Sequence, residues 1–153
     1  LVDACHARGI AVILDVVYNH AFSQSPLAQL YWDENNFRPA ADNPWLNVTP
    51  KHPFNVGYDF NHESLATREF VKRTIRYWLE EMKLDGFRFD LSKGFTQVEN
   101  TDVGAWSAYD ASRLVILKDY ADEVWNTTPG AYAIMEHFGS WEEELEMAEY
   151  GEG

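Results

Sequence analysis

The sequence predicts an α/β fold with a parallel sheet. Three short apolar runs rich in β-branched or aromatic residues alternate with longer stretches whose apolar residues recur every three or four positions. Hydrophobic residues make up 46% of the 153, which is enough to bury a core. A closed eight-stranded β/α barrel needs at least about 200 residues, so three strands in a chain of this length predict only part of one.

Residues 1–9 predict the end of a helix. Leu1, Ala4 and Cys5 recur at helical spacing, and Gly9 suits the left-handed residue at which many helices end. The following run, 10–17, is β-branched and apolar on both faces. We therefore expect a strand that helices cover on one side and core on the other.

Residues 21–62 lose this periodicity, and their prolines interrupt any long helix or strand. A stretch of this length without a regular pattern is unusual inside a compact domain and is commonly functional. We therefore expect a long excursion between the first strand and the next helix.

Regular elements return after the excursion. Apolar residues on one face predict a helix over 67–82, with Ser64 or Thr67 as its cap, followed by a strand over 87–91. Asp110 is expected to cap a second long helix that leads into a strand over 131–135. After Ser140, a suitable cap, three consecutive glutamates favour the start of a last helix.

Polar side chains follow each predicted strand on its carboxyl side. The three clusters are Asp15 with Asn19 and His20, Arg88 and Asp90 with Lys93, and Glu136 with His137. One such acid is usually a helix cap or a loop residue, but the carboxyl ends of parallel strands converge at one face. Three clusters in succession therefore predict one site.

Spacing along the second strand predicts how two of these residues interact. Arg88 and Asp90 are two apart, so they face the same side, and the guanidinium is expected to keep the carboxylate ionised. No cationic residue lies beside Glu136 in the sequence, which favours a raised pKa there. Glycoside hydrolysis uses two carboxyl groups in such different environments.

Composition excludes several classes of function. Twelve basic against 25 acidic residues give a net charge of −13, which disfavours nucleic acid and anionic membranes as partners. No apolar run is long enough to cross a membrane, so no membrane insertion is expected. The single cysteine, Cys5, forms no internal disulfide, no zinc-type spacing occurs, and the compartment stays open.

Three segments resemble ordered signature regions of the α-amylase family, glycoside hydrolase family 13. They are Asp15-Val-Val-Tyr-Asn-His20, Gly86-Phe-Arg-Phe-Asp-Leu-Ser-Lys93 and Ile134-Met-Glu136, and the run 57–64 resembles the family's Asp-Leu-Asn segment. The resemblance implies a partial TIM (β/α)8 barrel containing about strands three to five. Residues 1–153 would then be part of a catalytic domain, with 21–62 an inserted small domain.

The resemblance also assigns roles to individual residues. Asp90 would be the nucleophile of a retaining mechanism, Glu136 the acid and base, and Arg88 the residue that positions Asp90. Asp15, His20 and Lys93 would contribute to substrate binding. Asp15 would also support Arg88 from strand three, and His20 would hydrogen-bond the sugar in the subsite before the cleaved bond. Asn19 matches a calcium ligand in many members, and no organic cofactor is implied.

The implied substrate is an α-glucan, such as a starch-like or glycogen-like polysaccharide or an oligosaccharide. Aromatic residues of the excursion would either stack on sugar rings or form a small core: Tyr31, Trp32, Phe37, Trp45 and Phe54. Gly94 stands where many amylases have a histidine. The family's fourth signature, with its third carboxylate, has no counterpart in these 153 residues, and both ends look cut, so we expect the chain alone to be inactive.

Several alternatives stay open at this point. A branching, debranching or glucosyl-transfer enzyme would use Asp90 and Glu136 in the same way. A noncatalytic carbohydrate-binding relative is a different class, which the presence of both carboxylates argues against. A metal-dependent hydrolase using His20, His52 and His62 lacks the close histidine spacing of such sites.

Overall fold

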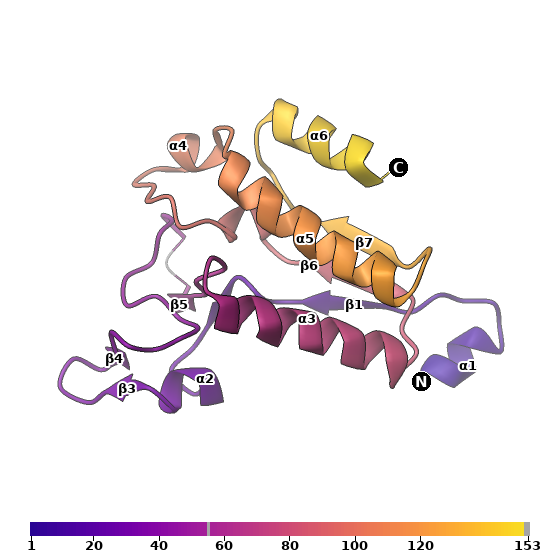
Figure 1. The fold of residues 1–153 in the computed structure, drawn as a ribbon, viewed down its shortest axis with the longest axis horizontal. Helices are drawn as coiled ribbons and strands as arrows, with labels where there is room; N and C mark the ends of the chain where they lie inside the picture. The colour runs from indigo at the N-terminus through magenta and orange to yellow at the C-terminus, as the bar shows by residue number, and fades with distance from the viewer. Residues whose placement is uncertain (55, 152–153) are drawn as a thin grey trace.

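A three-stranded parallel sheet forms the centre of the computed structural model, which describes residues 1–54 and 56–151. Its strands are β1 (Ile13–Val16), β6 (Gly86–Phe89) and β7 (Tyr132–Met135), in the order β1-β6-β7 (Figure 1). The register places Asp15 opposite Arg88, and Arg88 opposite Ile134. The predicted α/β class with a parallel sheet is confirmed.

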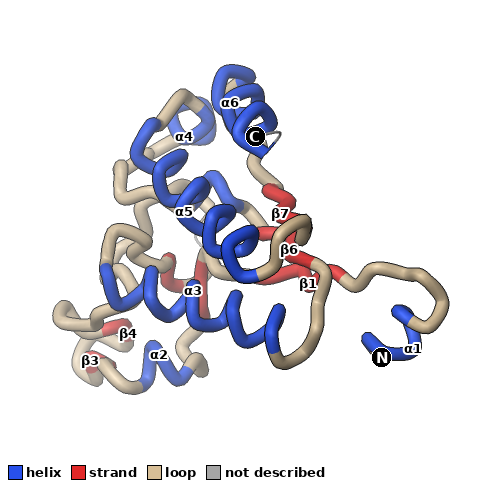
Figure 2. The backbone as a smooth tube through the Cα atoms, turned by 45° about the vertical axis from the view of Figure 1, so that its right-hand side comes forward, coloured by secondary structure: helices blue, strands red, loops and turns tan. Residues whose placement is uncertain are grey.

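Two long helices, α3 (Leu65–Glu80) and α5 (Ala111–Thr127), cover one face of this sheet (Figure 2). Buried side chains from the strands and these helices form the main core, including Val16, Phe87, Phe89, Ile75 and Leu117. The opposite face stays open within the described residues: Ile13 is 40% exposed and Ile134 42%. The expected burial of the first strand on both faces is therefore wrong for this part of the chain.

The first strand is also shorter than expected, because residues 10–12 have no strand partner. Ile13 is the first residue of β1 paired in the ladder, opposite Gly86. Before it, Val12 accepts a hydrogen bond from the Asp85 amide at 2.9 Å and donates one to the Asp85 carboxylate at 2.6 Å. The first helix, α1 (Val2–His6), is short, and Gly9 adopts the expected left-handed conformation.

The later helices begin where the capping residues predict. Asp110 caps α5 by accepting from the Ser112 amide at 2.9 Å. Ser64 precedes α3, but its hydroxyl donates to the Pro44 carbonyl at 2.6 Å instead of capping the helix. The remaining elements are the 3₁₀ turn η1 (Ser92–Gly94), α4 (Val103–Ser107) and α6 (Trp141–Gly151).

The excursion folds into short elements at the end of the sheet to which the strands point (Figure 1). They are β2 (His20–Ala21), α2 (Pro26–Gln29), β3 (Trp32–Asp33), β4 (Arg38–Pro39) and β5 (Tyr58–Asp59). Trp32 and Trp45 pack on a small core of Ala28, Leu46 and Phe60, whereas Phe37 is 74% exposed. The aromatic residues thus divide between core and surface.

None of the helices in the described residues is both long enough and apolar enough to cross a bilayer.

Candidate active site

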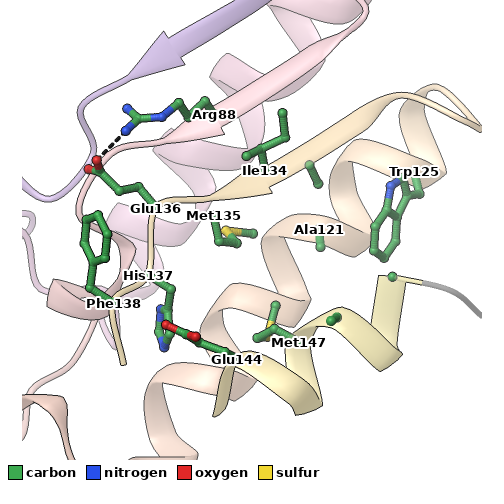
Figure 3. A pocket seen from close by; sticks show the side chains of 13 residues that line it. Arg88, Ala121, Trp125, Ile134, Met135, Glu136, His137, Phe138, Glu144 and Met147 are labelled. Atoms are coloured by element: carbon green, nitrogen blue, oxygen red, sulfur yellow. Dashed lines mark hydrogen bonds and ion pairs between the residues drawn. The ribbon is translucent and has the colours of Figure 1, made fainter. Parts of the chain in front are cut away.

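Arg88 lies between two carboxylates on the open face of the sheet. Its Nη1 atom is 2.9 Å from both oxygens of Asp15, and its Nη2 atom donates to Glu136 (Figure 3). Asp90 is more distant, with Oδ1 3.7 Å from Nη1. Three strands therefore contribute to one charged cluster, as the positions of the polar residues predict.

Strand geometry explains this convergence. Side chains two apart on a strand share a face, and register partners on neighbouring strands lie about 4.8 Å apart. Asp90 and Glu136 directly follow β6 and β7, and they extend the ladder through their amides, which donate to Val16 and Phe89 carbonyls at 3.0 Å. Both acids therefore stay at the carboxyl edge of the sheet.

Two predictions about the electrostatics of this cluster are wrong. Glu136 does have a cationic partner, because Arg88 reaches it across the sheet. Arg88 also does not set the pKa of Asp90: burial first, and then the negative charge of Glu136, raise that pKa above its ordinary value. The attraction of Arg88 opposes this shift but is outweighed.

The Glu136 carboxyl group is fixed from two directions. One oxygen accepts from Arg88, and the other accepts from the Leu91 amide at 3.1 Å. Leu91 has a left-handed backbone, with φ of 45°, which turns the chain directly after Asp90. The site thus presents two adjacent, partly exposed carboxyl groups with their orientation restrained, an arrangement suited to paired acid and nucleophilic chemistry.

Known proteins share this segment. The chain is 32% identical over 154 residues to the glycogen operon protein GlgX homolog of Mycobacterium tuberculosis (strain H37Rv). This alignment covers 94% of the chain and 20% of the relative. It is 36% identical over 100 residues to the chloroplastic isoamylase SU1 of Zea mays, and that alignment covers 63% of the chain and 12% of the isoamylase. No family model matches the chain.

A solved structure agrees with these relatives in fold. Pullulanase type I from Bacillus subtilis str. 168, complexed with maltose, superposes with a TM-score of 0.60 at 26% identity, over 88% of this chain and 16% of the pullulanase. The chain belongs to the α-amylase family of glycoside hydrolases, family 13. It spans 12–20% of the length of the curated relatives named above, and so corresponds to a small part of the family-13 catalytic domain.

Two further family-13 positions lie beside the carboxylates. His20 is half-buried; burial lowers its pKa, and the nearby charge of Asp90 opposes that shift. Asn19 is fully buried and donates to the Leu91 carbonyl at 3.3 Å. A sugar contact from His20 stays a prediction, whereas Asn19 supports the turn that follows Asp90.

Lys93 has a structural environment in this fold. It is 5% exposed, its ammonium group donates to Ser107 Oγ at 3.0 Å and to the Phe138 carbonyl at 3.2 Å, and it lies over the Trp106 ring. These contacts secure two loops near the site. The predicted contact of Lys93 with substrate stays a prediction.

Gly94, the departure from the amylase pattern, is required by packing. A Cβ atom there would lie 1.7 Å from Asn19 Nδ2 and 3.3 Å from His52 Nε2. The space next to the position of the missing histidine is thus occupied by Asn19, which precedes β2, and by His52 of the excursion. Gly94 therefore allows the close approach of Asn19 to the turn after Asp90.

Asn19 also bears on the predicted calcium site. Its Oδ1 atom is buried with no hydrogen-bond partner among the described residues, which suits an oxygen ligand. Calcium takes six to eight oxygen ligands, however, and no group of three or more acidic, histidine or cysteine residues that could hold a metal occurs in the part of the chain described. These residues do not fit calcium on their own, and we assign it no step.

The histidines proposed for a metal-dependent hydrolase do not converge on a metal. Both ring nitrogens of the buried His62 are engaged, 2.8 Å from the Tyr120 hydroxyl and 2.8 Å from the Tyr18 carbonyl. Burial lowers the pKa of His52 to about 4, and its ring stacks on Trp106. The geometry therefore gives no support to the metal-hydrolase alternative.

Sequence reasoning missed a buried charged group behind the site. Arg113 of α5 and Glu143 of α6 are both fully buried and paired at 2.6 Å, and Glu143 also contacts His137. Helical periodicity gives no sign of this pair, because Arg113 and Glu143 lie on different helices. A charged residue at a core-facing position of a predicted helix, such as Arg113 beside Leu114, is the one available signal.

Proposed function

We propose that the complete protein is a retaining α-glucan hydrolase that removes branches, with Asp90 and Glu136 as its reacting carboxyl groups. The observation that carries the proposal is that Asp90 and Glu136 directly follow β6 and β7 and both lie against Arg88, with Asp90 Oδ1 3.7 Å from Nη1 and Glu136 bonded to Nη2. Relatives named glycogen debranching enzyme, from Klebsiella pneumoniae and Erwinia tasmaniensis, support a debranching enzyme over an α-amylase acting on linear chains.

The proposed mechanism gives the two carboxyl groups different roles. Asp90 attacks the anomeric carbon while Glu136 donates its proton to the leaving oxygen, and Glu136 then takes a proton from the water that releases the sugar. Burial, and then the negative charge of Glu136, raise the pKa of Asp90 above its ordinary value. The mechanism requires an ionised Asp90 and a proton on Glu136 when the substrate binds.

Neighbouring groups would direct this chemistry. Arg88 and the Leu91 amide fix the orientation of the Glu136 carboxyl group. Asp15 holds the other side of the Arg88 guanidinium, and we propose that His20 and Lys93 contribute to sugar binding. Calcium at Asn19 remains a proposal that needs ligands beyond those described.

We also propose a place for this segment in a barrel. The parallel order β1-β6-β7, with helices on one face, suits strands three to five of an eight-stranded barrel whose interior is the open face. In that arrangement residues 21–62 form the small inserted domain after strand three. The active site then lies at the carboxyl ends of the strands, where β/α barrels place it.

Turnover of branched and linear glucans by the complete gene product tests the proposal. Amylopectin should release linear chains with α configuration at the new reducing end, and amylose should be a poor substrate. Asp90→Asn and Glu136→Gln should each lower kcat by at least about 1000-fold, whereas the exposed Glu142→Gln should leave it unchanged.

Each contrary outcome has a distinct meaning. Full activity in either carboxylate variant would show that the site is wrongly assigned. Rapid cleavage of amylose with no release from branch points would favour the α-amylase reading. Binding of malto-oligosaccharides without turnover would favour a noncatalytic relative.

A further inference from the structure

We infer that the contact between Ser92 and His137 positions the Glu136 carboxyl group, and that the buried Glu143 and Arg113 hold His137 for this purpose. The inference rests on the proposed role of Glu136 as proton donor. It assigns Ser92, His137 and Glu143 as positioning residues rather than groups that touch substrate.

Three hydrogen bonds of Leu91 and Ser92 join the turn after β6 to the turn after β7. The Ser92 amide donates to the Glu136 carbonyl at 2.9 Å, and the Leu91 amide donates to the Glu136 carboxylate at 3.1 Å. The third bond joins Ser92 Oγ and His137 Nδ1, which are 3.1 Å apart. Asp90 immediately precedes the first turn, so these bonds bear on the spacing of the two carboxyl groups.

Both turns need outside restraint because each contains a non-glycine residue in the left-handed region. Leu91 has φ of 45°, and Phe138 has φ of 51°. Such conformations persist only where the surroundings determine them. Lys93 contributes by donating to the Phe138 carbonyl, and the Ser92–His137 contact links one turn directly to the other.

The side chain of His137 points away from the catalytic face, toward α6, whereas Glu136 points toward Arg88 (Figure 3). His137 Nε2 lies 2.9 Å from Glu143 Oε2, so both ring nitrogens are engaged. The Glu143 carboxylate can only accept, so the proton of this hydrogen bond is on His137 Nε2. In a neutral imidazole Nδ1 is then an acceptor, and the Ser92 hydroxyl donates to it. This arrangement fixes the ring orientation directly beside Glu136.

Glu143 is itself immobilised by α5. Arg113 Nη2 donates to Glu143 Oε2 at 2.6 Å, and the Arg113 Nη1 atom donates to the Lys93 and Trp106 carbonyls at 3.2 and 2.7 Å. Gly139 makes room for this carboxylate, since a Cβ atom there would lie 2.3 Å from Glu143 Oε2. The network thus extends from the protein interior to the residue next to the proton donor.

Small errors in the position of a general acid are costly, because a displacement of about 1 Å can lower the rate 100-fold. A retaining mechanism also requires carboxyl groups about 5–5.5 Å apart. Loss of the Ser92–His137 bond should therefore reduce proton donation while leaving substrate binding intact.

The test uses Ser92→Ala and His137→Gln in the complete gene product. Glutamine at 137 can still reach Glu143 but cannot contact Ser92 through an Nδ1 position. On a branched glucan, each variant should lower kcat about 10- to 100-fold with KM within about twofold. The double variant should lose no more than the worse single variant, because both changes remove the same bond.

A substrate with a good leaving group separates positioning from general structural damage. A malto-oligosaccharyl fluoride needs little protonation of its leaving group, so its turnover by Ser92→Ala should stay within about threefold of wild type. His137→Asn, whose Oδ1 atom can still accept from Ser92, should retain more activity on glucan than His137→Gln. Ser64→Ala, which removes one hydroxyl hydrogen bond to the Pro44 carbonyl and none of the bonds between the two turns, is the matched control.

Equal losses on glucan and fluoride would overturn the inference and leave these residues a structural role only. Unchanged kcat on glucan in Ser92→Ala would overturn it as well. If Asp90→Asn or Glu136→Gln keeps full activity, the proposed function itself fails, which is a separate result. If Asp90→Asn and Glu136→Gln are inactive but Ser92→Ala has wild-type activity, the inference is rejected and the proposed function stands.

Discussion

Glu143→Gln removes a buried charge while preserving the shape of the side chain. In the native protein Glu143 accepts from Arg113 Nη2 at 2.6 Å, from the Asp110 amide at 2.6 Å and from His137 at 2.9 Å. Both Glu143 and Arg113 are 0% exposed. Removing one partner of a buried ion pair leaves the other charge uncompensated, at a cost of about 3–5 kcal/mol.

This cost is measurable as a loss of unfolding free energy. Urea unfolding of the complete gene product near neutral pH should show the transition that includes α5 and α6 destabilised by about 3–5 kcal/mol. Glu142→Gln makes the same chemical change at an exposed position of the same helix. Its unfolding free energy should change by no more than about 1 kcal/mol, because a helix-terminal charge is worth at most that much there.

The pH dependence gives an independent check of the cause. Burial alone would raise the pKa of Glu143, but hydrogen bonds from His137 and Arg113 lower it below its ordinary value of 4.5. The charged form therefore stabilises the fold fully above that value, and this contribution is lost as the pH falls through the lowered pKa. A loss below about 1 kcal/mol near neutral pH, or a stability gap from wild type that does not narrow in acid, would refute the reasoning.

Three other predictions concern stability. Burial, and then the charge of Glu136, raise the pKa of Asp90 above 3.8, so ionisation of Asp90 destabilises the fold as the pH rises. Asp90→Asn should therefore have a higher Tm than wild type at neutral pH. An equal or lower Tm would contradict this. Burial lowers the pKa of His62 from 6.5 to about 3, so stability should fall as the pH drops below 6.5, by at most about 1.4 kcal/mol per pH unit. Urea midpoints across that range should vary less in His62→Gln, and equal slopes would count against a neutral buried imidazole. Gly94→Ala places a Cβ atom 1.7 Å from Asn19 Nδ2 and should cost about 1–3 kcal/mol in urea unfolding, whereas wild-type stability would mean that Asn19 moves without cost.

Local pattern was sufficient to predict the elements that carry the site. The alternation in β6 places Arg88 and Asp90 on one face, and the register with β1 and β7 brings Asp15 and Glu136 beside them. These predictions hold because side-chain direction on a strand depends only on the parity of the position. The capping role of Asp110 was predictable for the same local reason.

Local pattern was insufficient to predict the ion pairs of Arg88. Sequence proximity favoured Asp90, which lies two residues along the strand at about 6.6 Å between Cα atoms, whereas partners across the sheet lie only about 4.8 Å apart. Arg88 accordingly contacts Asp15 at 2.9 Å and bonds Glu136, with Asp90 at 3.7 Å. The register of the sheet therefore decides which carboxylate the guanidinium neutralises.

The sequence by itself determined the α/β class, the long helices and the set of polar residues at the strand ends, since all three follow from periodicity along the chain. Only the tertiary structure decided where β1 begins, which partners Arg88 selects, and that Arg113, Glu143 and His137 form one buried network behind Glu136. Apart from the contact of His137 with Glu143, these features depend on contacts between residues 30–73 positions apart, whose energies come from burial and pairing that no single segment contains.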